Sequence, residues 1–425
     1  MNSKQLTVFL EQDQLNEKLS QLYPSPDAIR AQKDRYLRAI AAYESAFGSE
    51  DIEIYSAPGR TEVGGNHTDH QHGEVLTASI TKDAIGIVSR TDDGIIRLIS
   101  DGYPLITLHT DETAVQKSEY GTTTALIRGV IAGLKEHGCR VGGFQAYVTS
   151  DVLIGAGLSS SAAFETLIGT IESGLYNNNE ISPVEIAIIG QYAENVYFGK
   201  PCGLMDQMAC SVGSLVHIDF ADPAKPLVEQ IAFDFAAHGY RLCITDTKGS
   251  HADLTPDYAA VPSEMKSIAA YFGKEVLHEV PQEAVLENIA ALRERCGDRA
   301  VLRAFHFYEE NKRVQKEVQA LRSDRTDAFL AAVRSSGASS FQYLQNVYTS
   351  HDITRQNVSI ALQLAELVLK DRGAARVHGG GFAGTMQAWV PADLVAAYQK
   401  QMDSVFGDGS CAVLGIRSLG GCKVI

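Results

Sequence analysis

The sequence has no run of apolar residues long enough to cross a lipid bilayer. Its first residues, MNSKQLTVFLEQDQLNEK, interrupt the apolar positions with lysine and acids before a signal peptide could form. No internal repeat or low-complexity tract is present either. These absences predict a cytoplasmic protein that has no membrane partner.

Positive charge and paired cysteines are also scarce. Lysine and arginine number 37 against 52 aspartate and glutamate residues, a formal net charge of -15. That charge would repel a phosphate backbone and argues against broad nucleic-acid binding, although backbone N–H groups can still hold a small anion locally. The seven cysteines, from Cys139 to Cys422, contain no CxxC pair. We therefore expect reduced thiols rather than a disulfide framework or a structural zinc site.

The order of predicted elements indicates a mixed α+β protein with two lobes. The chain has 425 residues, more than one compact domain usually holds. Helical periodicity covers 26–47 and much of 263–372, and strand-like alternation occurs in a larger set of segments. Those segments are 52–60, 74–80, 84–90, 95–100, 144–150, 214–220, 240–247, 385–390 and 411–416. A boundary between 215 and 245 divides the chain into an N-terminal domain, 1–225, and a C-terminal domain, 226–425.

The segment DVLIGAGLSSSAAFET, residues 151–166, predicts a strand, a loop of small residues and a helix. Small residues allow a close backbone approach, and a helix N-terminus presents unpaired N–H groups, so the loop suits a polyphosphate. It is not a Walker A loop, because no Gly-Lys-Ser/Thr follows. The structural alternative is a serine that caps the helix after a flexible turn.

Two carboxylates follow a second predicted helix. Ser182, Pro183 and Glu185 are typical of a helix start with a capping box, and the helix should end at Gly199. Glu194 lies near that end, where it is either a ligand or a solvated helix residue. Asp206 lies among apolar residues in CGLMDQMAC, where it is either buried for a purpose or a capping group.

The segment GGNHTDHQHG, residues 64–73, places three histidines and an aspartate within six positions. If it is extended, alternation puts His67 and Asp69 on one face and His70 and His72 on another. Asp69 could then accept hydrogen bonds from neighbouring hydroxyl groups of a ligand, and His67 could donate or accept one. A zinc site would need three or four converging ligands, usually including a more distant one.

Taken together, these segments resemble the GHMP family of small-molecule kinases, and within it the galactokinases, from about residue 54 to the C-terminus. APGRTEVGGNHTDHQHGEVL is similar to the galactokinase signature PGRVNLIGEHTDYNGG, and GAGLSSSAAFE to the family's ATP loop. CGLMDQ matches the catalytic-aspartate segment, and GGGFAG, residues 379–384, resembles the third glycine motif. The weaker match DTKGSHADLTPDYAAV points to Tyr258. The resemblance implies the two-lobed GHMP fold, with the active site in a cleft between the lobes.

The resemblance also assigns roles to individual residues. It implies that Asp206 faces the anomeric hydroxyl of the sugar, with Arg60 as its cationic neighbour. It implies that Glu194 and Ser161 bind Mg²⁺. The sugar contacts that it implies are Asn66, His67, Asp69, Gly203 and Tyr258. The residues that it implies cradle the phosphates of ATP are Gly155, Ala156, Gly157, Leu158, Ser159, Ser160, Ser161 and Ala162.

Asn66 is the main departure from the signature, which has Glu in the corresponding Gly-Glu-His triplet. A carboxylate only accepts hydrogen bonds and would repel an acidic C6 group, whereas an amide both donates and accepts. Galacturonate kinases of the family also lack this Glu and share an HxDHQ-like run. His70 and His72 stand where the family commonly has other residues, and we assign them no chemistry.

Three functions are consistent with these residues. The first is an ATP-dependent kinase that converts galactose to galactose 1-phosphate, and the second is a kinase for galacturonate or another galacto-configured sugar. The third is a sensor that binds sugar and ATP without turnover, against which the complete set Arg60, Glu194 and Asp206 argues. The sequence leaves open whether the chain is a monomer or a homodimer.

Overall fold

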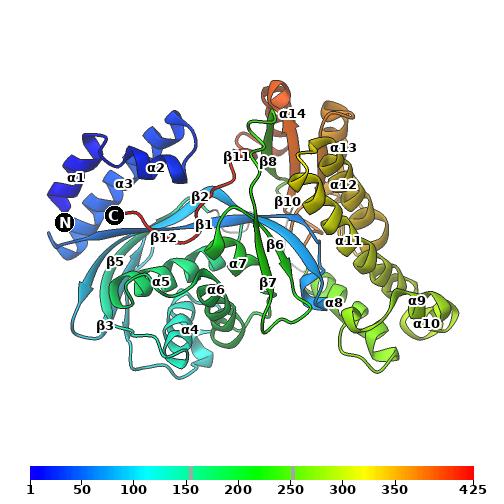
Figure 1. Cartoon of the computed structure of the whole chain (residues 1–425), viewed down its shortest axis with the longest axis horizontal. Coiled ribbons are helices and arrows are strands. Elements are labelled where there is room, and N and C mark those ends of the chain that lie inside the picture. Colours follow the sequence, from blue (N-terminus) through cyan, green and yellow to red (C-terminus); the bar gives the residue numbers. More distant parts are fainter. Residues whose placement is uncertain (153–156, 250–253) are drawn as a thin grey trace.

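We describe a computed structural model that covers residues 1–152, 157–249 and 254–425 (Figure 1). Its larger sheet has eight strands in the order β12-β1-β2-β5-β3-β4, with β6 paired to β2 and β7 to β6. The pairing of β3 with β5 is parallel, and the other pairings are antiparallel. The strands are β1 (Glu53–Gly64), β2 (Glu74–Thr91), β3 (Ile95–Ser100), β4 (Ile106–His109), β5 (Gly143–Ser150), β6 (Leu215–Asp219), β7 (Leu227–Ile231) and β12 (Cys422–Lys423).

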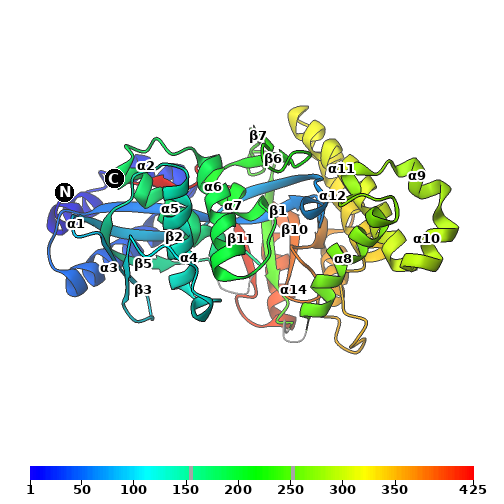
Figure 2. The same cartoon turned by 90° about the horizontal axis from the view of Figure 1, so that it is seen from below.

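Helices cover both faces of this sheet. The N-terminal helices on one face are α1 (Ser3–Glu11), α2 (Asn16–Leu22) and α3 (Pro26–Phe47). The helices on the other face, in front of the sheet in Figure 2, are α4 (Thr123–Glu136), α5 (Ser160–Tyr176), α6 (Pro183–Tyr192) and α7 (Met205–Val212). Strand alternation explains both layers, because Ile85 and Ile87 pack against the N-terminal helices while Ala84 and Val88 pack against the others.

A second sheet has four antiparallel strands in the order β11-β8-β10-β9. These are β8 (Tyr240–Asp246), β9 (Ala374–Val377), β10 (Thr385–Pro391) and β11 (Cys411–Leu414). The later helices are α8 (Thr255–Tyr271), α9 (Gln282–Glu287), α10 (Ile289–Cys296), α11 (Asp298–Arg322), α12 (Thr326–Ser339), α13 (Asn357–Leu369) and α14 (Val395–Phe406). The mixed α+β class predicted from the sequence is confirmed.

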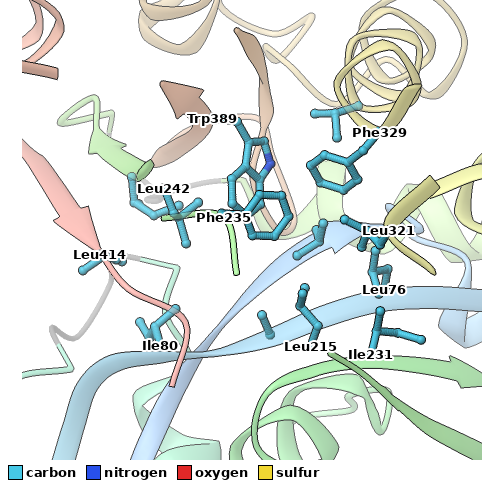
Figure 3. Packing of buried hydrophobic residues seen from close by; sticks show 14 of the residues in the cluster. Leu76, Ile80, Leu215, Ile231, Phe235, Leu242, Leu321, Phe329, Trp389 and Leu414 are labelled. Carbon is cyan, nitrogen blue, oxygen red and sulfur yellow. The ribbon is translucent and has the colours of Figure 1, made fainter. Parts of the chain in front are cut away.

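One hydrophobic cluster joins the two sheets (Figure 3). Leu76 from β2 and Leu215 from β6 belong to the same buried cluster as Leu242 from β8 and Trp389 from β10. Phe329 from α12 completes this cluster, with its ring edge-on to Trp389 at a centroid distance of 5.4 Å.

The division of the chain into two domains at 225/226 stays a prediction. Strand β7, just beyond it, and the C-terminal β12 both pair within the larger sheet.

A buried charged cluster anchors the N-terminal helices to the larger sheet. Asp83 of β2 accepts hydrogen bonds from Tyr23 at 2.6 Å, Arg35 at 2.7 Å and Arg417 at 2.9 Å. The Asp83 and Arg417 side chains have no exposed surface. The N-terminal extension is thus part of the folded body.

The observed strand and helix boundaries differ from the predicted ones in one place and agree with them in another. The segments 74–80 and 84–90 form one continuous strand, β2, rather than two. Ser182 caps α6 by accepting a hydrogen bond from the Glu185 N–H at 3.2 Å, and the helix continues as a π-helical turn, η3 (Ala193–Phe198), up to Gly199.

All seven cysteines are free thiols. None of the helices within the described ranges combines the length and apolar character that a membrane span requires.

Candidate active site

Arg60 and Asp206 form the centre of the site. Arg60 lies on β1, and Asp206 lies in the first turn of α7. The guanidinium donates two parallel hydrogen bonds to the carboxylate, from Nε to Oδ1 at 2.6 Å and from Nη2 to Oδ2 at 2.8 Å. This is the paired geometry in which arginine binds a carboxylate most specifically. The two residues that the family resemblance made catalytic are therefore in direct contact.

The serine loop meets this pair. Ser159 donates a hydrogen bond from Oγ to Asp206 Oδ2, and Arg60 Nη1 donates to the carbonyl of Gly157. Ser159 has a left-handed backbone, with φ of 57°, and makes no side-chain capping bond to α5. The capping alternative for this serine is therefore wrong, because its hydroxyl is directed to Asp206 instead of the helix N–H groups.

The charges of this group shift the pKa of its acids in opposite directions. Burial alone would raise the pKa of Asp206, but the adjoining Arg60 guanidinium and the Ser159 hydroxyl lower it below its usual value. Burial, followed by the negative charge of Asp206, raises the pKa of Asp69 to about 6. Asp206 is therefore ionised at neutral pH and is by itself a weak base.

Asp69 packs against Gly203, which immediately precedes Leu204 and α7. A Cβ atom at position 203 would lie 1.8 Å from Asp69 Oδ2. Glycine is required here because the carboxylate occupies the space that any other side chain would need. Two residues that the resemblance assigned to the sugar are thus brought together, next to Asp206.

We expect Gly203→Ala to raise the KM for the sugar by about 10- to 100-fold, because the new methyl group must displace the Asp69 carboxylate. The measurement is steady-state kinetics at saturating ATP. Gly86→Ala is a matched control, because its Cβ would meet its nearest atom at 3.4 Å, an ordinary contact. A Gly203→Ala protein with an unchanged sugar KM would show that Asp69 does not contact the sugar.

The segment around His67 differs from the extended conformation that we expected. His67 has a left-handed backbone, with φ of 60°, and Asp69–Gln71 form a 3-10 turn, η1. The left-handed backbone at His67 and the turn that follows bring His67 and His70 together, with Nδ1 of His67 3.2 Å from Nε2 of His70. The prediction that alternation separates these two histidines is therefore wrong.

His67 also contacts the third glycine motif. Its Nε2 lies 3.1 Å from the carbonyl oxygen of Gly380, so Nε2 carries the proton and Nδ1 accepts from His70. Burial lowers the pKa of His67 to about 4, and the ring is neutral at pH 7. Both ring nitrogens have protein partners, and a hydrogen bond from His67 to a sugar would replace one of them.

Tyr258 reaches the same motif from α8. Its hydroxyl donates to the Gly381 carbonyl at 2.9 Å, and its ring lies edge-on to Phe382 at a centroid distance of 5.4 Å. A Cβ atom at Gly380 would lie 2.6 Å from the tyrosine ring. Tyr258 and His67 thus flank Gly380, as expected if both border one sugar site.

Asn66 is fully buried, with an exposed fraction of 0%. Its amide donates to Glu62 Oε1 at 3.0 Å and to the Gly379 carbonyl at 2.8 Å. Its oxygen accepts from Ser340 at 3.2 Å and from Asn346 at 2.8 Å. An amide has two donor and two acceptor positions, so protein groups occupy all of them. Direct contact with a sugar stays a prediction that would require one of these bonds to break.

Glu194 and Ser161 meet beside the serine loop. The Ser161 hydroxyl donates to Glu194 Oε1 at 3.1 Å, and Lys200 Nζ lies 3.1 Å from the same oxygen. Mg²⁺ prefers oxygen ligands and often uses one or two carboxylates together with substrate phosphates. The contact between the Ser161 hydroxyl and the Glu194 carboxylate fits such an ion. The ammonium group of Lys200 already lies beside the same carboxylate oxygen. Across residues 1–152, 157–249 and 254–425, no three His, Cys, Asp or Glu side chains converge to hold a metal alone.

The remaining residues of the predicted phosphate loop are placed differently. Leu158 and Ala162 are buried in the cluster between the sheets, so their side chains face away from a ligand and only their backbone could contact phosphate. Ser160 is half-buried at the start of α5. Gly157 has φ of 68°, which favours glycine. Gly155 and Ala156 lie outside the described residues.

Two residues of the hydrogen-bond network around Glu194, Gln207 and Glu165, were not predicted from the sequence. Gln207 donates from Nε2 to Glu194 Oε2 at 2.8 Å and to Glu165 Oε2 at 3.0 Å. Burial, followed by the charge of Glu194, raises the pKa of Glu165 well above its usual value. A local signal was available for both, because Gln207 follows Asp206 directly and Glu165 lies one helical turn after Ser161.

Comparison with known proteins identifies the class first. The GHMP kinases N terminal domain matches residues 125–214, and the galactokinase galactose-binding signature matches residues 41–90. A crystal structure of mevalonate kinase shares the fold, with a TM-score of 0.61, 15% identity and coverage of 85% of this chain and 98% of that chain. The fold is that of the GHMP kinases.

Closer relatives identify the family. Galactokinase of Streptomyces coelicolor is 32% identical over 371 residues, which are 86% of this chain and 91% of that protein. Galactokinase of Glaesserella parasuis serovar 5 is 31% identical and covers 84% of this chain and 90% of its own. Lactococcus lactis galactokinase, crystallised with galactose, matches with a TM-score of 0.77 at 25% identity, over 90% of this chain and 98% of that chain. The chain belongs to the galactokinase family.

Proposed function

We propose that this protein transfers the γ-phosphoryl group of ATP to the anomeric hydroxyl of galactose, giving galactose 1-phosphate and ADP. The observation that carries the proposal is the paired contact between Arg60 and Asp206, with Ser159 of the serine loop bonded to the same carboxylate. A phosphoryl transfer requires an acceptor hydroxyl, a positive charge and a phosphate-binding loop at one point. In this chain β1, α7 and the start of α5 meet there.

The geometry supports a division of roles between the two central residues. Asp206, ionised and held on both oxygens, orients the anomeric hydroxyl and takes its proton as the oxygen–phosphorus bond forms. Its lowered pKa makes it a weak base, so Arg60 is required to stabilise the negative charge on the transferring group. Asp69, opposite Gly203, accepts hydrogen bonds from the other sugar hydroxyls.

Mg²⁺ belongs to this proposal with Glu194 and Ser161 as its protein ligands. The ion would neutralise charge on the phosphates of ATP. Gln207 fixes the second oxygen of Glu194, leaving the first oxygen directed to Ser161 and Lys200. The loop from Gly155 to Ala162 remains our proposed phosphate cradle. The cytoplasmic location stays a prediction from the sequence.

A second candidate substrate is galacturonate, favoured by the amide at position 66 in place of a carboxylate. A coupled ADP-release assay with the purified protein tests both candidates and the sensor alternative. It should be run with galactose, galacturonate, N-acetylgalactosamine, arabinose and glucose at matched concentrations. We expect the largest kcat/KM with galactose. Larger kcat/KM for galacturonate would select the second candidate, and absence of turnover with every sugar would contradict the kinase proposal.

A further inference from the structure

Two departures from the galactokinase signature are reciprocal. The signature PGRVNLIGEH has asparagine two residues after its arginine and glutamate six residues after it. Counted from Arg60, this chain has Glu62 and Asn66 at those positions. The same two residue types are present in the opposite order. The carboxylate missing from position 66 is therefore retained four residues earlier.

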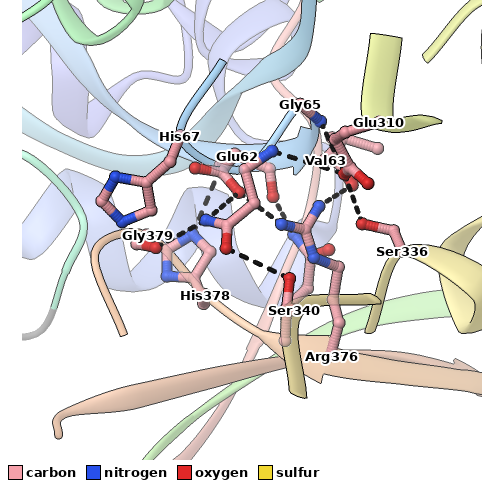
Figure 4. A network of polar contacts seen from close by, with 12 residues as sticks. Glu62, Val63, Gly65, His67, Glu310, Ser336, Ser340, Arg376, His378 and Gly379 are labelled. Carbon is pink, nitrogen blue, oxygen red and sulfur yellow. Dashed lines mark hydrogen bonds and ion pairs between the residues drawn. The ribbon is translucent and has the colours of Figure 1, made fainter. Parts of the chain in front are cut away.

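The two side chains contact each other. Asn66 Nδ2 donates to Glu62 Oε1 at 3.0 Å, and both residues are buried. Figure 4 shows Glu62 in this polar network, together with Arg376 and Gly379. The same amide donates to the Gly379 carbonyl at 2.8 Å. The pair thereby links the sugar loop, defined here as residues 64–73, to the glycine loop, defined as residues 379–381.

Arg376 of β9 provides the balancing charge. Its Nη2 donates to Glu62 Oε1, its Nη1 donates to the Val63 carbonyl at 2.7 Å, and the side chain has no exposed surface. Burial raises the pKa of Glu62 to about 7, against the opposing effect of Arg376. A buried carboxylate with one cationic partner is stable only while its hydrogen bonds are kept.

Counting donors and acceptors explains why the two positions must change together. A glutamate or aspartate at 66, when ionised, would only accept hydrogen bonds. It would face the Glu62 carboxylate and the Gly379 carbonyl, which are acceptors as well. An amide at 62 removes the first of these two conflicts, because it can donate to a carboxylate at 66. The arrangements Glu62/Asn66 and amide-62/carboxylate-66 each pair a donor with an acceptor, whereas two carboxylates at these positions do not.

We propose that Glu62 and Asn66 act as one positioning pair, which holds the sugar loop against the glycine loop and so sets the affinity for the sugar. Its effect reaches the substrate through His67, the next residue, whose Nε2 donates to Gly380 of the glycine loop at 3.1 Å. The inference rests on the proposed function only in naming the sugar as the ligand. Position 66 thus influences sugar binding through its contact with position 62 and through the neighbouring His67.

The test is a double-mutant cycle with substitutions that conserve size: Glu62→Gln, Asn66→Asp and the double variant. We expect Asn66→Asp to raise the sugar KM about tenfold, because the hydrogen bonds from the amide to Glu62 and to Gly379 are both lost, and to leave the ATP KM within about twofold. The double variant should recover the part of that loss that is due to the contact with position 62. Additive effects in the cycle, or equal changes in the sugar and ATP KM, would overturn the proposal.

Thermal unfolding of the same four proteins keeps the test independent of activity. If Asn66→Asp does not fold, the double variant should fold and approach the wild-type Tm, and failure to do so would also overturn the proposal. Asp83→Asn is the matched control, since it disturbs the other buried charged cluster and should lower Tm without changing the sugar KM. Wild-type protein without galactose-dependent ADP release would refute the proposed function, while the coupling in Tm would still test the pair.

The pair also changes how sugar selectivity should be tested. Asn66→Glu alone places two acceptors in contact and is expected to lose affinity for every sugar. In the double variant Glu62→Asn with Asn66→Glu, which restores the signature, we expect recovery of sugar affinity relative to Asn66→Glu and a higher ratio of galactose to galacturonate kcat/KM than in wild type. A double variant no better than Asn66→Glu would contradict the assignment of sugar affinity to this pair, and an unchanged ratio would contradict the assignment of C6 selectivity to position 66.

Discussion

Asp206→Asn is expected to lower kcat by about 10²- to 10⁴-fold, the range for loss of a positioned proton acceptor. Asparagine has nearly the same shape, and its oxygen can still accept a hydrogen bond from Arg60 or Ser159. It cannot take the proton of the anomeric hydroxyl. The expected loss is therefore in the chemical step, and the KM for ATP should change little.

ADP release at saturating substrates measures this loss, and single-turnover kinetics separates the chemical step from product release. Asp111→Asn is a suitable control, because the Asp111 side chain is 99% exposed and remote from the described contacts of Asp206. A kcat within a few-fold of wild type in a folded Asp206→Asn protein would mean that the proton leaves by another route.

Arg60→Met is expected to lower kcat by about 10²- to 10³-fold, because it removes the positive charge that the transferring group needs. It should also change the pH dependence. In the wild type the Arg60 charge holds the pKa of Asp206 below its usual value. We therefore expect Asp206 to stay ionised and kcat to be flat down to acidic pH. Without Arg60, burial and the nearby Asp69 raise that pKa. The kcat of the variant should then increase with pH over a range where the wild type is constant.

The profile should be measured on kcat rather than on kcat/KM. The pKa of Asp69 is raised to about 6, so its protonation below that pH should weaken sugar binding in both proteins. Arg60→Lys keeps the charge but loses the two parallel bonds, and we expect an intermediate kcat with a smaller shift. An Arg60→Met profile parallel to that of the wild type would show that Arg60 does not control the ionisation of Asp206.

Much of the site follows from local sequence. The cap of α6 acts over a few residues, because the Ser182 side chain satisfies a backbone N–H within the first turn of the helix. Ser161 and Glu194, which the family resemblance names as Mg²⁺ ligands, are in contact, and their role as ligands stays a prediction. Other contacts had no local signal: Asn66 bonds to Gly379 and Asn346, about 280 to 313 residues away in the chain. Such pairs depend on how α11, α12 and the second sheet pack against β1.

Within its ten residues, the GGNHTDHQHG segment shows the same difference between features that follow from local sequence and contacts that depend on distant residues. The residue types indicate hydroxyl recognition, and the sequence by itself determined that Asp69 and His67 are the candidates. Only the tertiary structure decided which groups are free to do it. Gly203 allows the Asp69 carboxylate to lie beside Asp206, whereas protein partners, the glycine loop among them, occupy both nitrogens of His67 and the whole amide of Asn66. The physical reason is that a residue's chemistry belongs to its own side chain, while its accessible donors and acceptors depend on neighbours that the fold brings from distant parts of the chain.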